Sequence, residues 1–470
     1  MLFNSIEFFI LLTVTLLLYW SSKSILWRQT CLLVASLIFY TYWFPPYLIL
    51  FLSLALFTYI FGLKIERGEK RSLFFSVLLL VGILSIFKYT NFFLHLVSQS
   101  FHTLGWNFTF STIDIRLPLG ISFIVFELIS YLVDIKLKKT HPENNLRVFT
   151  LFLAFFPHLI AGPICRTNQL IPQFHQKIAF SFHQFIGGLV LIMSGLFLKV
   201  CFADGLAPFV DSVFNSQVGF TGKPTLWATI GFGVQIFCDF WGYSTIAVGA
   251  ARLFGIDIPI NFNLPYVSTS LREFWRRWHI TLSTWIRDYL YIPLGGSRQG
   301  QLQTAGNLMI TMGLCGLWHG ASLNFVVWGL AHGVFLVIER FCSHLFQFIQ
   351  KTLLGRIISL LWPPVGWLIT ISFVFITWIF FRATTLEQAI AILGTLFTPA
   401  NLFSAETPPR SFFILLLTFG LIHIPLSKLM DAMHTEKIRA SWRFVIAWWL
   451  FVLSIVMSSG ESLQFIYFEF

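Results

Sequence analysis

The sequence predicts an all-α polytopic membrane protein, and its composition and charge placement are the observations behind that prediction. Of the 470 residues, 56% are hydrophobic and 11% are charged, and the mean hydropathy is +0.77. An ordinary soluble protein carries about 25% charged residues. The formal net charge of +11 is spread over short connections between apolar runs. This pattern indicates positive-inside topology and argues against a nucleic-acid-binding surface.

The N-terminal part of the chain can be divided into spans, since a spanning helix needs about 20 apolar residues. The run at 6–20 lacks a basic leader and a small-residue cleavage site, so we expect it to be retained. The stretches 42–47 and 91–112 carry no Lys or Arg and are predicted to be external. Basic residues follow the first, third and fifth apolar runs, so these runs are expected to end in the cytoplasm. The chain would then start outside. They are Lys23 and Arg28; Lys64, Arg67, Lys70 and Arg71; and Lys136, Lys138, Lys139 and Arg147.

Residues 148–164 form an apolar run with a basic residue at each flank, Arg147 and Arg166. Pro157 and Pro163 would break a helix within this run. Broken backbone is tolerated at membrane depth only where it is buried in protein or lines a cavity. We therefore expect a re-entrant segment here.

The rest of the chain alternates between predicted spans and connections. Residues 303–338 start and end beside positive charge and are too long for one span, so they should fold back near the sequence GLWHGAS. The C-terminus is then expected outside. The full prediction is a span at 181–203, an external loop at 204–224, a span at 225–250, a cytoplasmic loop at 252–301, the folded-back segment, and spans near 357–380, 411–426 and 444–459.

The loop 252–301 combines arginines with spaced aromatic residues, including Trp275, Trp278 and Trp285. One interpretation is a basic helix at the membrane surface that anchors the topology. The other is a site for a phosphate-rich donor, in which arginines bind phosphates and rings contact the rest of the ligand. The residues expected to bind substrate here are Arg276, Arg277, Trp278, Ser283 and Trp285, and His279 lies among them.

Two histidines, His319 and His332, lie in an apolar stretch that has no Asp, Glu, Lys or Arg between Gly313 and Ile338. An ionisable group in a membrane segment usually marks a pathway or a reaction. His332 is interpreted as mainly structural. The six cysteines include no CxxC pair, so we expect reduced cysteines and no metal site.

Several motifs resemble those of the membrane-bound O-acyltransferase (MBOAT) family, especially its bacterial branch that O-acetylates extracytoplasmic polysaccharides. They are LREFWRRWHITLSTWIRDYLYIPLGG, GLCGLWHGASLNFVVWGLAHG, PLGISFIVFELISYLVDI, FFPHLIAGPICR and QIFCDFWGYSTIAVGAARLFGI. The resemblance implies a single membrane domain over residues 1–470, built as a ring of tilted helices with re-entrant segments around a central funnel. It also implies that His319 of the WHG motif is catalytic and that His279 of the RRWH motif supports the site.

Some positions depart from the pattern of that family. Leu323 stands where Trp is common, Trp241 and Thr245 replace a Ser and an Asp, and Glu127 stands where Gln is frequent. These changes bear on the substrate more than on the reaction. The YIPLGG ending favours the acetylating branch over the D-alanylating one.

His319 is the better candidate for a general base. A hydroxyl that attacks a thioester needs such a base, which is worth about a hundred- to ten-thousand-fold in rate. Burial favours the neutral imidazole, which can accept a proton. Asn324 is expected to orient the ring or polarise the acyl carbonyl, and Trp318 to contact substrate.

Three further residues have more than one reading. Asp239 and Tyr243 stand four positions apart on one helical face, and they are predicted either to line the substrate path or to form a structural pair. The role of His158 in the broken segment stays open.

The functional prediction is a bacterial inner-membrane acetyltransferase that uses cytoplasmic acetyl-CoA as its donor, with no tightly bound cofactor. The acceptor would be an extracytoplasmic polysaccharide such as peptidoglycan or alginate, reached through a hydrolase-like transferase partner outside the membrane. A different acyl group, such as D-alanyl, is one alternative. The other is a transporter or channel for a small anion along a histidine-lined path, although the sequence has no internal repeat of the transporter kind.

Overall fold

The computed structural model describes residues 1–160, 162–216, 219–349, 352–398, 407–434, 438–457 and 465–466. The regular structure of these residues is helical, which confirms the predicted all-α class. Six helices are long and apolar enough to cross a membrane, so the polytopic prediction is also confirmed. They are Tyr47–Glu66, Ser72–Thr103, Phe182–Phe214, Leu323–Ser343, Ser359–Arg382 and Arg410–Met433.

The chain divides into two compact units, and each is described by itself. The first contains Met1–Gly188 and Ala247–Pro259, and the second contains Leu189–Ile246 and Ile260–Phe470. The single domain over residues 1–470 and the ring with a central funnel stay predictions.

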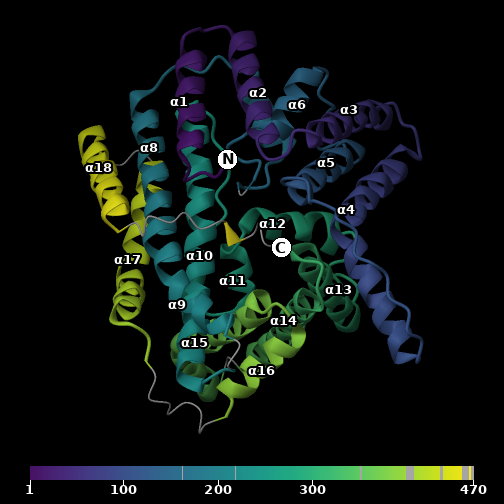
Figure 1. The fold of residues 1–470 in the computed structure, drawn as a ribbon, viewed down its shortest axis with the longest axis vertical. Coiled ribbons are helices and arrows are strands. Elements are labelled where there is room, and N and C mark those ends of the chain that lie inside the picture. The colour runs from purple at the N-terminus through teal and green to yellow at the C-terminus, as the bar shows by residue number, and fades with distance from the viewer. Residues whose placement is uncertain are drawn as a thin grey trace. The chain divides into compact units, whose positions relative to one another are not determined.

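The first unit is a set of packed helices in which α1 lies beside α2, and α5 beside α3 and α4 (Figure 1). At about 1.5 Å per residue, the 32-residue helix α4 is longer than the hydrocarbon core of a bilayer, so one end extends beyond it. The helices are α1 (Ile6–Trp20), α2 (Ile25–Thr41), α3 (Tyr47–Glu66), α4 (Ser72–Thr103), α5 (Ile121–Lys136), α6 (Leu146–Ala154), α7 (Thr167–Phe174) and the first turns of α8 (Phe182–Phe197).

The run at 148–164 is broken, as its prolines predict. Helix α6 has nine residues, too few to cross a membrane, and irregular backbone follows it. Glu127 on α5 holds this backbone, because its Oε1 accepts the Cys165 N–H at 3.1 Å and lies 3.3 Å from His158 Nδ1. The other ring nitrogen of His158, Nε2, donates to the Phe152 carbonyl at 2.9 Å. His158 therefore helps to fix the fold of the broken run.

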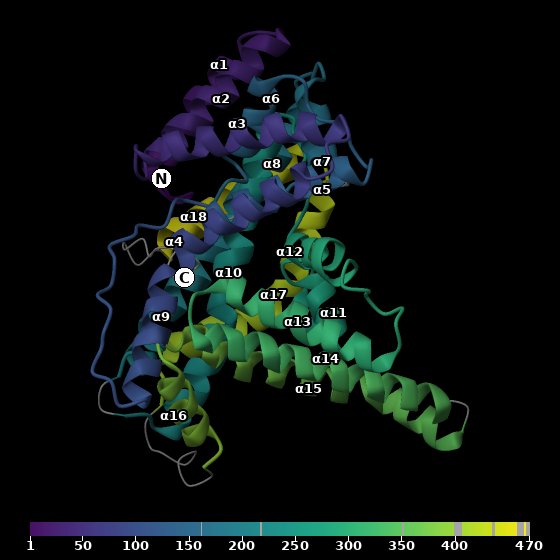
Figure 2. The ribbon, with the colours of Figure 1, turned by 90° about the vertical axis from the view of Figure 1, so that its right-hand side faces the viewer.

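The second unit contains a layered arrangement in which α14 packs between α13 and α15 (Figure 2). Its helices are the π-helix η1 (Leu198–Ala203), α9 (Asp204–Phe214), α10 (Gly222–Leu253, up to Ile246), the 3-10 helix η2 (Pro265–Val267), α11 (Leu271–Arg277), α12 (Ile280–Ile286), the π-helix η3 (Arg287–Tyr291), α13 (Gln301–His319), α14 (Leu323–Ile349), α15 (Leu353–Arg382), α16 (Leu386–Leu396), α17 (Arg410–His434) and α18 (Ala440–Val456).

The predicted external loop at 204–224 is wrong over its first half. Helical structure continues through η1 and α9 to Phe214. Two carboxylates in this stretch are paired. Asp204 bonds Lys199 at 2.8 Å, and Asp211 bonds Arg382 at 2.8 Å. Neither charge therefore requires the helix to end.

Candidate active site

The predicted fold-back of 303–338 is confirmed, and small residues explain how close the two helices come. Helix α13 ends at His319, and α14 begins at Leu323. A Cβ on Gly316 would stand 2.1 Å from the Phe325 carbonyl oxygen, and one on Gly329 would stand 2.2 Å from that of Met312. Only glycine permits this approach, which places His319 at a buried turn between two tightly packed helices.

His319 is 4% exposed and lies among three aromatic rings. Its ring centroid is 4.9 Å from that of Trp318, 5.1 Å from that of Trp328 and 5.2 Å from that of Phe381. These rings come from α13, α14 and α15 respectively. The candidate base is thus enclosed by the layered helices of the second unit.

His279 also lies near Trp318. It sits between α11 and α12 in a left-handed backbone conformation (φ 42°, ψ 55°), which side-chain-bearing residues rarely adopt. The centroid of its ring is 6.3 Å from that of Trp318 and 4.7 Å from that of Phe240. The structure therefore groups His279 with Trp318 and His319, although His279 and His319 are 40 positions apart in the sequence.

The unusual backbone at His279 is fixed by hydrogen bonds from its neighbours. The Ile280 N–H donates to the Asn261 carbonyl at 2.9 Å. The Thr281 hydroxyl donates to Asn261 Oδ1 at 2.6 Å. These contacts hold the start of α12 and with it the direction of the His279 side chain.

Asn324 lies beside the turn but is partly engaged in packing. Its Nδ2 donates to the Ala383 carbonyl at 2.7 Å, which ties α14 to the end of α15. Its buried Oδ1 has no hydrogen-bond partner among the described residues. The expected role of Asn324 toward the His319 ring or the acyl carbonyl stays a prediction.

The arginines of the basic loop differ from each other. Arg277 pairs with Glu273 at 2.9 Å and donates to the Asn263 carbonyl at 3.1 Å. Burial raises the pKa of Glu273, but the Thr269 N–H and Arg277 outweigh it and lower that pKa overall. Arg276 is exposed and has no hydrogen bond or ion pair within the described part of the chain. Arg276 is thus the arginine of this pair that remains available to a ligand.

The other predicted binding residues of this loop are largely inside the protein. One of the two interpretations put Trp278 and Trp285 at the membrane surface, but they are 1% and 6% exposed. The Trp278 ring lies 5.0 Å from that of Trp378, and the Ser283 hydroxyl donates to the Trp278 carbonyl at 3.1 Å. The interface-facing interpretation is therefore wrong for Trp278 and Trp285, because their rings fill the core of the second unit.

Asp239 and Tyr243 belong to a buried charged cluster that the sequence analysis did not identify. Lys199 Nζ lies 2.7 Å from Asp239 Oδ1 and 2.8 Å from Asp204 Oδ1. The Tyr243 ring lies 5.7 Å from the ammonium, and the Ile466 N–H donates to Asp239 Oδ2 at 2.7 Å. The lysine within an apolar run was the available signal for this cluster.

His332 makes a well-defined structural contact. Its Nε2 is 3.0 Å from the Thr377 hydroxyl, which itself donates to the Val374 carbonyl at 2.9 Å. A hydroxyl has one proton to give, so Nε2 must be the donor to Thr377. The partner is a side chain on α15, and the ring also lies 4.7 Å from that of Trp328.

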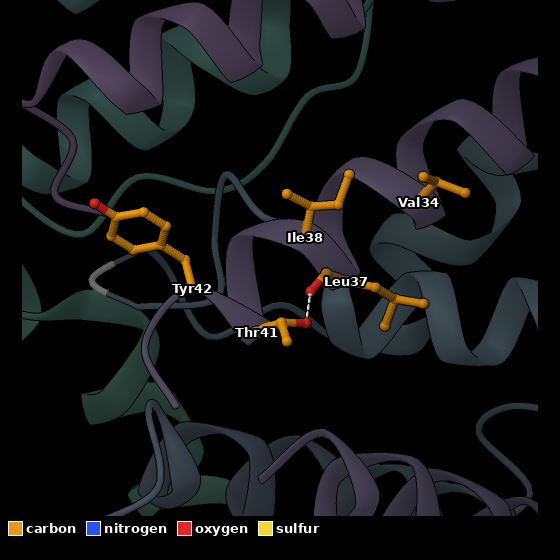
Figure 3. A pocket seen from close by; sticks show the side chains of 5 residues that line it. All are labelled: Val34, Leu37, Ile38, Thr41 and Tyr42. Atoms are coloured by element: carbon orange, nitrogen blue, oxygen red, sulfur yellow. Dashed lines mark hydrogen bonds between the residues drawn. The ribbon is translucent and has the colours of Figure 1, made fainter. Parts of the chain in front are cut away.

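A separate pocket of about 480 Å³ lies against α2 in the first unit (Figure 3). Its lining is mainly aliphatic, and its polar hydroxyl at Thr41 is bonded to the Leu37 carbonyl. The pocket has no His, Asp, Glu, Lys or Cys among its lining residues, and its other hydroxyl belongs to Tyr42. The lining residues are Val34, Leu37, Ile38, Thr41 and Tyr42.

The fold and the enclosed histidines define a polytopic membrane protein with a buried site suited to acid–base chemistry. The family described as "MBOAT, membrane-bound O-acyltransferase family" matches residues 144–381, which include both His279 and His319. The chain belongs to this family and is an O-acyltransferase. This membership decides between the enzyme and the anion transporter in favour of the enzyme.

Two of the curated relatives described here match over most of the chain, and a third matches about half of it. The "Probable alginate O-acetylase AlgI" of Pseudomonas aeruginosa is 40% identical over 405 residues, which cover 85% of this chain and 75% of the relative. The "Peptidoglycan O-acetyltransferase" of Helicobacter pylori is 35% identical over 406 residues, covering 79% and 74%. The "Teichoic acid D-alanyltransferase" of Streptococcus thermophilus is 30% identical over 241 residues, covering 47% and 56%.

Proposed function

We propose that this protein transfers an acetyl group from cytoplasmic acetyl-CoA to a hydroxyl of an extracytoplasmic polysaccharide, with His319 as the general base. The observation that carries the proposal is the position of His319, which is buried at the turn between α13 and α14 and shares the neighbouring ring of Trp318 with His279. General-base catalysis requires an imidazole that can reach the proton of the acceptor hydroxyl.

In the proposed reaction, His319 removes the proton of the hydroxyl as its oxygen attacks the acetyl carbonyl. The carbon–sulfur bond of the thioester breaks, and the CoA thiolate takes up the proton that His319 received. The products are an acetyl ester and CoA, so no other reactant is needed. His279 acts beside this step as an electrostatic or donor-positioning group.

The donor side of the proposal rests on the loop that carries His279. Exposed Arg276 suits the phosphates of CoA, because its planar guanidinium can bind two phosphate oxygens at once. The positive-inside pattern supports a cytoplasmic position for this loop, on the side where acetyl-CoA is found. The same pattern supports an N-terminus outside the bacterial inner membrane.

The acceptor side rests on the relatives, whose names include alginate and peptidoglycan O-acetylation. A polysaccharide hydroxyl of one of these classes is the proposed final acceptor. An extracytoplasmic transferase partner would carry the acetyl group onward to the polymer. The D-alanyl alternative has weaker support, since that relative matches 47% of the chain.

The test measures thiol release from acetyl-CoA by the purified protein in nanodiscs, with soluble alginate and peptidoglycan fragments as acceptors. His319→Ala should lose at least about a hundredfold of the rate, the lower end for a missing general base. The variant should still bind CoA, because the donor contacts lie on the basic loop. His423→Ala is the control: it removes a histidine of the same unit that hydrogen-bonds its own helix.

The outcomes separate the parts of the proposal. Near-normal acetyl transfer by His319→Ala would exclude His319 as the base. If the wild-type protein released no thiol with acetyl-CoA but accepted a D-alanyl thioester, the acyl group would be wrong while the role of His319 stood. Loss of activity in His423→Ala to the same degree would show that the assay reports folding and not chemistry.

A further inference from the structure

The three rings around His319 share one geometry. Their planes are inclined to the imidazole by 76° for Trp318, 86° for Trp328 and 69° for Phe381. The exposed fractions of these rings are 6%, 0% and 1% respectively. We call Trp318, Trp328 and Phe381 the aromatic cage. His319 is thus in contact with aromatic surface on several sides and is shielded from bulk water.

A second layer of rings holds the aromatic cage in place. Trp378 stacks on Trp328, with centroids 5.9 Å apart and planes at 19°, and meets Phe381 edge-on at 5.2 Å. Phe325 packs on Phe381 at 4.9 Å. His332 lies against Trp328 and is itself anchored to Thr377. The cage is therefore a packed structure in which each ring has a defined position.

The charged and titratable groups near the cage are few in the described residues. His332 lies against Trp328, and His279 lies 6.3 Å from Trp318. Arg382 follows Phe381 on α15, but its guanidinium bonds Asp211 at 2.8 Å. Protonation of His319 would thus create a cation next to aromatic rings.

We infer that the aromatic cage stabilises the imidazolium that forms when His319 takes the acceptor proton. This inference rests on the proposed function, since it needs His319 to be the base. In a perpendicular pair, the edge of the imidazole can point at the face of the neighbouring ring. That face is negative and attracts a cation that lies over it within about 6 Å of the centroid, most strongly where water is excluded. In this step the cage residues act through His319 and serve as positioning residues. Their contribution belongs to the transition state, so it raises kcat.

The variants Trp328→Phe and Trp328→Leu separate an aromatic effect from a packing effect. Phenylalanine keeps a ring face, whereas leucine keeps an apolar side chain without one. We expect Trp328→Leu to lower kcat by about tenfold, as expected for a buried cation–π contact. Its KM for acetyl-CoA should stay unchanged, and Trp328→Phe should retain most of the wild-type kcat.

The pH profile of kcat/KM gives a second readout with a defined sign. Without the Trp328 ring, the imidazolium of His319 is less stable, so His319 stays neutral down to a lower pH. The acid limb of the profile should therefore move to lower pH in Trp328→Leu. Looser packing alone would admit water, favour the charged imidazole and move the limb to higher pH. The direction of movement therefore decides between the two causes.

Trp378→Leu is the matched control, because Trp378 belongs to the second layer of rings. It should lower the unfolding temperature without moving the acid limb. Equal kcat values and equal acid limbs for Trp328→Leu and Trp328→Phe would overturn the inference. If Trp328→Leu does not extract as a folded protein, Phe381→Leu provides the same comparison on α15. Full activity of His319→Ala would instead reject the proposed function, so the two failures are distinguishable.

Discussion

Single residues with the same sequence signal play different roles in this molecule. Arg276 and Arg277 are neighbours in one basic motif, yet Arg277 is held by Glu273 and Asn263, and Arg276 is exposed. The RRWH and WHG motifs predicted a shared site for His279 and His319, and the structure brings both rings near Trp318. Phe381 had no comparable signal, because it lies 62 positions after His319 in an apolar run.

The difference between the two arginines can be measured. Arg276→Gln should raise the KM for acetyl-CoA by about fivefold, as expected for the loss of roughly 1 kcal/mol from one exposed charge contact. Its unfolding temperature should not change, because no intramolecular bond is lost. Arg277→Gln should lower the unfolding temperature, since Glu273 and Asn263 lose their partner. The reverse pattern would mean that Arg277 binds the donor.

At the level of helices, the sequence predicted the turn at His319. It misplaced the end of an earlier span, which was predicted over 181–203 and continues as helix to Phe214. The turn was visible because a segment without charges was too long for one crossing. The continuation of the helix to Phe214 was not visible, because its carboxylates find partners through the fold. Asp211 pairs with Arg382, which lies 171 positions away. A charge pattern alone cannot reveal such compensation.

The contact between α13 and α14 should tolerate no added methyl group. Gly316→Ala should destabilise the protein by about 1–3 kcal/mol, the usual cost of overpacking, and should displace His319 enough to reduce transfer. Gly306→Ala on the same helix is the control, because a Cβ there would meet no atom within 4 Å. It should be neutral or stabilising by up to about 1 kcal/mol, as alanine favours helix. Thermal unfolding in detergent compares the two, and equal unfolding temperatures would contradict the close approach.

The buried charged cluster makes a second prediction at this scale. Lys199→Met should destabilise the protein by about 3–5 kcal/mol, because it leaves Asp204 and Asp239 without their shared cation. Adding Asp204→Asn and Asp239→Asn to that variant should restore much of the loss. If the triple variant were no more stable than Lys199→Met, the destabilisation would come from packing and not from charge.

For the whole molecule, the orientation of the protein in the membrane remains a prediction from the charge pattern. Ser297 lies in the basic loop and Ser111 in the stretch predicted to be external, and both are exposed. In a Cys342→Ser background, an impermeant maleimide should label Ser111→Cys in intact cells. It should label Ser297→Cys only in inverted vesicles. Labelling of Ser297→Cys in intact cells would show that the basic loop faces outside. The predicted topology would then be wrong, and the proposed donor site would lie on the opposite side of the membrane from acetyl-CoA.

The pairing of Lys199 with Asp204 also bears on how the chain is made. The two residues stand five positions apart in one continuous helical stretch, whereas Asp239 is synthesised 35 residues after Asp204. Each isolated charge costs about 3 kcal/mol on entering the bilayer from the translocation channel. Because the pair forms within one stretch, we expect that stretch to enter the lipid already neutral. Asp239 then enters later and joins an ammonium that is already in place and already paired with Asp204, so the order of synthesis sets the order in which the two carboxylates reach their shared cation.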